Sequence, residues 1–307
     1  MEFNISLSLG YTLVRGRNPG FYQVYKECDI ALYRGKGTTK NALILFRPQE
    51  EEQEHRKRQI VLGLKTAIER GEFFLVYQPI YDVELSQPIA YEALIRWYNK
   101  NLGLVSPGEF IPYAEATGLI LELGRYVIDK AIKDSKRLNL PVHINLSARQ
   151  LYDTSLPNYL ESLTKMEELP PDKVVLEITE SQDVLMDEYL TSQIKILQLM
   201  GFGVSLDDFG TGYSNIVLLN ELRPKNLKID MSIVRMLETP YEEKEAEAII
   251  RAIVDIAKAL TIDVVAEGVD SKLKKEKLYA LGVNKMQGFY FGKPERLEVL
   301  LNLSNSS

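Results

Sequence analysis

Two adjacent carboxylates, Asp207 and Asp208, stand where an apolar strand pattern runs into a glycine-bearing loop, Phe209-Gly210-Thr211-Gly212. Successive strand side chains point to opposite faces, so both aspartates can serve one site only where the strand ends and the backbone turns. Gly210 and Gly212 permit such a turn. Carboxylate oxygens bind hard cations. The pair indicates either a cation site or a cap on a turn or helix start, and the run alone favours neither.

Short apolar runs alternate with longer amphipathic segments from residue 73 onward, which predicts βα units around a parallel sheet. Helical spacing of apolar residues, for example, predicts a helix over residues 242–260. Eight such runs predict an α/β fold with a (β/α)8 TIM-like barrel. The expected strands are Phe73–Tyr77, Ile89–Ile95, Val142–Leu146, Val174–Ile178, Gly203–Leu206, Asn226–Ile229, Asp263–Ala266 and Lys285–Tyr290.

Polar residues stand within or just after seven of these strands. In barrels of this kind the chemistry lies at the carboxyl ends of the strands. Carboxylates that converge there repel one another unless cations or protons neutralise them. We expect two cations, with Asp207 bridging them and a water between them made nucleophilic. The residues are Glu92, Asn145, Glu177, Asp207 with Asp208, Lys228, Glu267 and Gln287.

Lys228 is open to three interpretations. It can orient the water or stabilise phosphate charge, act as a Schiff-base nucleophile as in barrel aldolases, or form an ion pair with Asp230. Position alone favours the ion pair. His143 lies two residues before Asn145 on the same strand face, deeper in the barrel, and is expected to be a packing residue. No Ser-His-Asp triad has a clear candidate set in this sequence.

The composition limits the possible partners. Two histidines and one cysteine, Cys28, are too few for the usual zinc sites and exclude an internal disulfide framework, so Mg²⁺ or Mn²⁺ is expected. A net charge of -6 argues against binding to duplex nucleic acid. No apolar stretch reaches membrane-spanning length, and the start Met1-Glu2-Phe3 lacks the pattern of a secretory signal. We therefore expect a soluble, cytoplasmic chain with no membrane segment.

Seven motifs, in order, resemble the EAL-domain cyclic di-GMP phosphodiesterases. The resemblance spans about residues 58 to 300 and is far more specific than any single motif. The motifs are Glu92-Ala93-Leu94-Ile95-Arg96-Trp97, Asn145-Leu146-Ser147-Ala148-Arg149-Gln150-Leu151, Glu177-Ile178-Thr179-Glu180-Ser181, the Asp207-Asp208 run, Leu227-Lys228-Ile229-Asp230, Ala266-Glu267-Gly268-Val269 and Gln287-Gly288-Phe289.

The resemblance implies hydrolysis of cyclic di-GMP to linear pGpG with two Mg²⁺ or Mn²⁺ ions per site. It assigns one metal to Glu92, Asn145, Glu177 and Asp207, and the other to Asp207 and Asp208. The matched catalytic residues are Glu92, Lys228, which positions water and phosphate, Glu267, a general base or second-metal ligand, and Gln287, which orients the water. The matched substrate contacts are Gln78, Arg96 and Asp230; arginine suits phosphate because its planar donors bind two oxygens.

Further expectations follow from the same resemblance. Glu180 matches the glutamate that anchors the loop after Asp208, which the family uses to couple dimerisation to activity, so a homodimer through the barrel is expected. Asn215 and Asp270 depart from the family pattern, and neither is a matched metal ligand. The alternative function is a catalytically silent cyclic di-GMP receptor, although such members often lack metal ligands that this chain keeps. A Schiff-base aldolase follows from the barrel alone.

The amino-terminal residues form a separate small α+β pattern, with a strand over 5–14, a helix over 20–34 and a strand over 41–46. Cys28-Asp29-Ile30-Ala31-Leu32-Tyr33-Arg34-Gly35-Lys36, followed by Lys40-Asn41, resembles the last part of a GGDEF diguanylate cyclase domain. Its signature stretch is absent, so we expect no cyclase activity. The expected division is a GGDEF-like fragment over 1–47, a connecting helix over 48–66 and the barrel over 67–307.

Overall fold

The computed structural model describes residues 7–14, 19–38, 42–179, 187–210 and 216–304. The chain divides into two compact units. The first comprises residues 1–66 with 99–103, and the second comprises residues 67–98 with 104–307. Among the described residues, no helix is both long and apolar enough to cross a membrane.

The first unit contains two short parallel strands and two helices. β1 (Leu9–Tyr11) pairs with β2 (Leu43–Leu45), and α1 (Phe21–Thr38) connects them. The strands are shorter than the sequence patterns predicted, and α1 runs past the predicted end at residue 34. Parallel strands need a long crossover, and α1 supplies it. α2 (Pro48–Ala67) then leads to the second unit.

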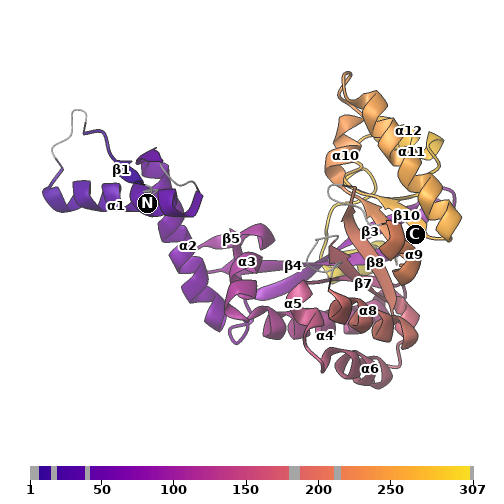
Figure 1. Cartoon of the computed structure of the whole chain (residues 1–307). Coiled ribbons are helices and arrows are strands. Elements are labelled where there is room, and N and C mark those ends of the chain that lie inside the picture. Colours follow the sequence, from indigo (N-terminus) through magenta and orange to yellow (C-terminus); the bar gives the residue numbers. More distant parts are fainter. Residues whose placement is uncertain (1–6, 15–18, 39–41, 180–186, 211–215, 305–307) are drawn as a thin grey trace, which may run out of the picture. The chain divides into compact units, whose positions relative to one another are not determined.

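The second unit is a closed barrel of eight strands, with helices between successive strands from β4 onward (Figure 1). The sheet order is β3-β11-β10-β9-β8-β7-β6-β4, a β3–β4 pairing closes it, and the short β5 adds to β4. All eight predicted strands are confirmed. Their bounds are β3 (Phe73–Asp82), β4 (Gln87–Asn99), β6 (Val142–Leu146), β7 (Val174–Thr179), β8 (Gly203–Phe209), β9 (Asn226–Ile229), β10 (Asp263–Ala266) and β11 (Lys285–Gln287), and the additional short strand is β5 (Gly103–Val105).

The first barrel strand corrects the prediction of a wholly parallel sheet. β3 is antiparallel to both of its neighbours, β4 and β11. The reason is local: only residues 83–86 separate β3 from β4, and a connection this short joins antiparallel strands. Asp82 stabilises the turn by accepting hydrogen bonds at Oδ1 from the amides of Glu84 and Leu85, at 2.9 and 3.0 Å.

The core lies mainly between the outer face of the barrel and its helices. Alternate strand residues such as Leu176 and Ile178 point outward into this layer, which forms two large apolar clusters. On α11 the predicted helix is confirmed, although Ile249 and Leu260 are only partly buried. The helices are α3 (Pro107–Thr117), α4 (Ile120–Leu138), α5 (Ala148–Leu151), α6 (Leu156–Met166), α8 (Glu188–Leu199), α9 (Ile216–Leu222), α10 (Met231–Met236), α11 (Glu243–Leu260), α12 (Lys272–Ala280) and α13 (Leu297–Ser304).

The inner face of the barrel is different in character. Its apolar part is small and includes Ile80, Ala90 and Val265. The other inward positions, two residues apart along each strand, carry polar and charged side chains toward the carboxyl ends of the parallel strands. Such an interior is costly to bury unless its members pair with one another or with ligands.

Candidate active site

A bulge in β8 brings Asp207 and Asp208 to the same site. Leu206 pairs with Leu227, and Phe209 pairs with Ile229, so β8 holds one residue more than β9 over this interval. The extra residue lets Asp208 adopt a left-handed backbone with φ of 57°. The amide of Asp208 then donates to Oδ1 of Asp207 at 3.0 Å. The backbone turn predicted for the glycine-bearing loop thus begins at Asp208, within β8.

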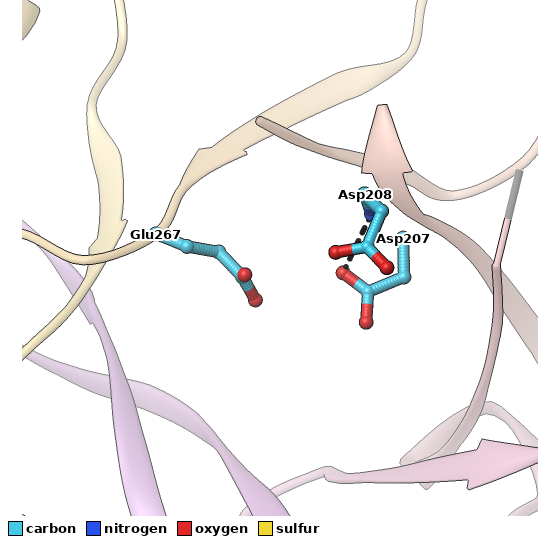
Figure 2. Close-up of side chains that lie close together, drawn as sticks. All are labelled: Asp207, Asp208 and Glu267. Carbon is cyan, nitrogen blue, oxygen red and sulfur yellow. Dashed lines mark hydrogen bonds between the residues drawn. The ribbon is translucent and has the colours of Figure 1, made fainter. Parts of the chain in front are cut away.

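Glu267 faces the two aspartates from the neighbouring side of the barrel. It follows β10 directly, and its amide donates to the carbonyl of Ile229 at 3.1 Å. One carboxylate oxygen from each of Asp207, Asp208 and Glu267 lies within 4.8 Å of the others. Figure 2 shows the three carboxylates directed toward a common space. This is the ligand chemistry that Mg²⁺ and Mn²⁺ prefer.

Lys228 lies fully buried among four carboxylates. Its Nζ is 2.6 Å from Glu267 Oε1 and 2.8 Å from Glu177 Oε2. It is also 3.3 Å from Asp207 Oδ1 and 3.5 Å from Glu92 Oε2. With Asp208, five carboxylates face one ammonium, which leaves four negative charges uncompensated if all are ionised. Such a set requires protons or cations.

The prediction of an ion pair between Lys228 and Asp230, which position alone favoured, is wrong. Asp230 instead forms the N-cap of α10, where its Oδ1 accepts a hydrogen bond from the amide of Ser232 at 2.9 Å and another from the Ser232 hydroxyl. Lys228 points into the barrel from β9, whereas Asp230 lies just past the end of that strand and caps the following helix, so the two side chains separate.

Amide side chains hold Glu92 from two sides. Asn145 donates from Nδ2 to Glu92 Oε1 at 2.7 Å, and Gln287 donates from Nε2 to Glu92 Oε2 at 2.6 Å. Gln287 Nε2 also lies 3.3 Å from Gln78 Oε1, while Gln78 donates to the carbonyl of Gly292 at 3.2 Å. The structure thus brings together predicted residues from β3, β4, β6 and β11.

The interpretation of His143 as a packing residue is incomplete, because its ring contacts the site. His143 Nδ1 lies 2.7 Å from Glu177 Oε1, and both side chains are buried. The position of His143 could be read from the sequence, since it stands two residues before Asn145 on the same face. Its contact with Glu177 could not, because Glu177 belongs to the next strand.

The electrostatics of the site follow from burial and crowding. Burial, with Asp207 and Glu92 nearby, raises the pKa of Glu267 to about 7 despite Lys228. Burial and the adjacent Asp207 raise the pKa of Asp208 to about 6. Burial also acts to raise the pKa of Glu92, but Lys228 and two amide hydrogen bonds lower it overall. Acids with such different proton affinities in one cavity are typical of functional sites.

The remaining residues singled out in the sequence either lie apart from this cluster or fall outside the described residues. Arg96 is half-buried on β4, where Nη1 donates to the carbonyl of Ile95 at 2.8 Å. Asp270 accepts a hydrogen bond from Lys274 Nζ at 2.7 Å. Glu180 and Asn215 fall outside the described residues, so the expected anchoring of the loop after Asp208 stays a prediction.

Comparison with known proteins finds one family whose profile matches most of the barrel. A family profile described as EAL domain matches residues 63–294. "Bifunctional diguanylate cyclase/cyclic di-GMP phosphodiesterase MucR" of Pseudomonas aeruginosa is 34% identical, over 98% of this chain and 44% of its own length. "Cyclic di-GMP phosphodiesterase PdeR" of Escherichia coli is 34% identical, over 96% of this chain and 45% of its own. The chain spans less than half the length of these two curated relatives.

A solved structure described as "PaMucR Phosphodiesterase, c-di-GMP complex" superposes with a TM-score of 0.74 and 35% sequence identity. The match covers 79% of this chain and 99% of that one. The family match covers most of this chain, and the closed barrel with helices around it agrees with the structural match. This chain belongs to the EAL domain family.

Proposed function

We propose that this chain hydrolyses one phosphodiester bond of cyclic di-GMP, giving linear pGpG, with two divalent cations. The observation that carries the proposal is the excess of carboxylates over ammonium groups at the barrel mouth, with ligand oxygens of Asp207, Asp208 and Glu267 within 4.8 Å of one another. The names of MucR and PdeR and the ligand in the MucR structure support the substrate.

The donor set fits Mg²⁺ or Mn²⁺, since it consists of carboxylate and amide oxygens. When bound, the cations supply charge neutralisation and lower the pKa of a water at the site. One cation is proposed at Glu92, Asn145, Glu177 and Asp207, and the other at Asp207 and Asp208.

The chain's own residues then have separate roles in the proposed reaction. Lys228 keeps its charge, because the surrounding carboxylates raise its pKa well above the ordinary value although burial opposes this. It is therefore suited to hold the attacking water and a phosphate oxygen. Glu267, with a pKa of about 7, can accept the proton of that water at Oε2 or serve as a further cation ligand. Gln287 helps to orient the water, while Gln78, Arg96 and Asp230 contact the substrate.

The decisive experiment is incubation of the chain with cyclic di-GMP and either Mg²⁺ or Mn²⁺, with product analysis for pGpG. We expect Asp207→Ala to abolish turnover and cation binding together. The matched control is Asp129→Ala, which removes an exposed carboxylate on α4 that pairs with Lys133. A folded wild-type chain that binds cyclic di-GMP but gives no product in either metal would assign it as a receptor instead.

The domain organisation is also a proposal. We propose that residues 1–47 are the end of a GGDEF-like domain, residues 48–66 a connecting helix and residues 67–307 the phosphodiesterase barrel. The support is the parallel β1–α1–β2 arrangement and the α2 helix between the two. Limited proteolysis tests the division, which predicts a stable fragment that begins near residue 67.

We further propose that the chain acts in the cytoplasm as a homodimer formed through the barrel, with Glu180 coupling the dimer to the cation site. The support is the family relationship. Light scattering measures the oligomeric state of the purified chain and of the Glu180→Ala variant, and a hydrolysis assay on both tests the coupling. A monomer at all concentrations that still hydrolyses the substrate would rule out the coupling.

A further inference from the structure

His143 is a buried polar residue on the inner face of β6. It pairs in register with Glu92 on β4 and with Val175 on β7, and only 4% of it is exposed. An imidazole in this position loses water on every side, so its ring nitrogens need partners within the barrel. The partner found for Nδ1 is Glu177, on the adjacent strand.

The contact holds one oxygen of a carboxylate whose other oxygen is held by Lys228. His143 Nδ1 is 2.7 Å from Glu177 Oε1, and Lys228 Nζ is 2.8 Å from Glu177 Oε2. The side chain of Glu177 is fully buried. Its orientation is therefore set by two donors on two different strands, β6 and β9.

The two donors differ in what else they contact. Lys228 also reaches Glu92, Asp207 and Glu267, so its hold on Glu177 is shared with three other acids. A neutral imidazole can carry its proton on Nδ1, and in that tautomer His143 donates a hydrogen bond to Glu177 Oε1.

We propose that His143 is a positioning residue for the cation site, acting through its Nδ1 hydrogen bond to Glu177. This inference rests on the proposed function, in which Glu177 is a cation ligand. His143 keeps Oε1 of Glu177 in place whether Oε2 contacts Lys228 or a cation. The Glu177 carboxylate therefore already has its orientation when a cation binds. Outer hydrogen bonds of this kind commonly change metal affinity by about 10–100-fold.

Three substitutions separate this role from simple packing. His143→Asn places an amide nitrogen where Nδ1 now lies, His143→Gln places one where Nε2 lies, and His143→Leu fills the space without a donor. The packing control is Val175→Ala, which opens a cavity beside His143 and leaves the Glu177 hydrogen bonds in place. Thermal unfolding of each cation-free variant checks that the barrel has formed.

The first measurement is the affinity for Mn²⁺ by calorimetry, with no substrate present. We expect His143→Asn to stay within about threefold of the wild type. We expect His143→Gln and His143→Leu to bind Mn²⁺ about tenfold or more weakly. Val175→Ala should retain wild-type affinity even where its unfolding temperature falls. If the Leu variant does not fold, the comparison of Asn with Gln decides the matter alone.

The second measurement is the pair of steady-state constants with cyclic di-GMP at saturating Mn²⁺. A positioning role predicts that kcat falls for the Gln variant while KM changes little, and that the Asn variant recovers kcat. If all three variants bind Mn²⁺ equally well, or if the Asn and Gln variants lose affinity equally, the positioning role of His143 is overturned while the proposed function stands. A wild-type chain that binds no Mn²⁺ overturns the proposed function, and this inference with it.

Discussion

Lys228 Nζ lies 2.6 Å from Glu267 Oε1, so one ion pair joins β9 to the residue that follows β10. The same ammonium contacts carboxylates from three other strands. Lys228 is therefore the one positive charge in direct contact with the acids of the described site, and its removal is the sharpest test of how the site is neutralised.

Lys228→Met should destabilise the cation-free chain strongly at pH 8. Removal of one partner from a buried charge cluster costs about 3–5 kcal/mol, because the remaining carboxylates lose their compensation. Denaturant unfolding with and without Mn²⁺ measures the change, and Mn²⁺ should restore part of the lost stability. The matched control is Lys195→Met, whose exposed pair with Glu221 is worth about 0–1 kcal/mol. Equal effects of the two substitutions would contradict the ion-pair network.

The cation-free chain should become less stable as the pH rises from 5 to 8. Glu267 has a folded-state pKa of about 7, above its ordinary value of 4.5, so the folded chain binds more protons in this window. The stabilisation that protonated Glu267 contributes is fully present below a pH of 4.5 and is lost as the pH rises through about 7, by about 3 kcal/mol in all. Glu267→Gln should flatten the profile in denaturant unfolding. A profile that rises with pH in both proteins would refute this expectation.

Asp208→Gly should be more stable than Asp208→Ala in the absence of cations. The left-handed backbone at Asp208 costs a residue with a Cβ atom about 1 kcal/mol, and glycine avoids that cost. Both variants should lose cation binding. The corresponding pair at Asp207, which lacks a positive φ, should show the reverse order of stability. Thermal and denaturant unfolding of the four proteins measures both differences.

Gly288→Ala should disturb the site from behind Gln287. A Cβ atom at Gly288 would lie 2.1 Å from the carbonyl oxygen of Val269, and that carbonyl accepts a hydrogen bond from the amide of Tyr290. Relief of such a clash costs about 1–3 kcal/mol and moves the loop that follows Glu267. Gly108→Ala, where the nearest atom is 3.9 Å away, is the control. Unaltered stability and turnover in Gly288→Ala would show that this loop yields freely.

The strands and the acidic residues were predictable because their signals are local. Apolar runs of a few residues identified all eight barrel strands, and polar residues at their ends identified the residues that now surround Lys228. The expected parallel order failed only at β3, where the close connection to β4 imposed an antiparallel pair.

Contacts between strands were not predictable in the same way. Lys228 was expected to pair with Asp230, two residues away, but β9 ends at Ile229, so Asp230 caps α10 while Lys228 points into the barrel toward Glu177. His143 was expected to pack, and the register of β6 with β7 gave it a carboxylate partner.

The sequence by itself determined that this chain folds as an EAL-type barrel and which acids stand at its strand ends, since periodicity and motif order are properties of the chain. Only the tertiary structure decided how those acids share one lysine, how a bulge turns Asp207 and Asp208 to one side, and that His143 holds Glu177. These outcomes depend on cross-strand register, which is fixed when the barrel closes.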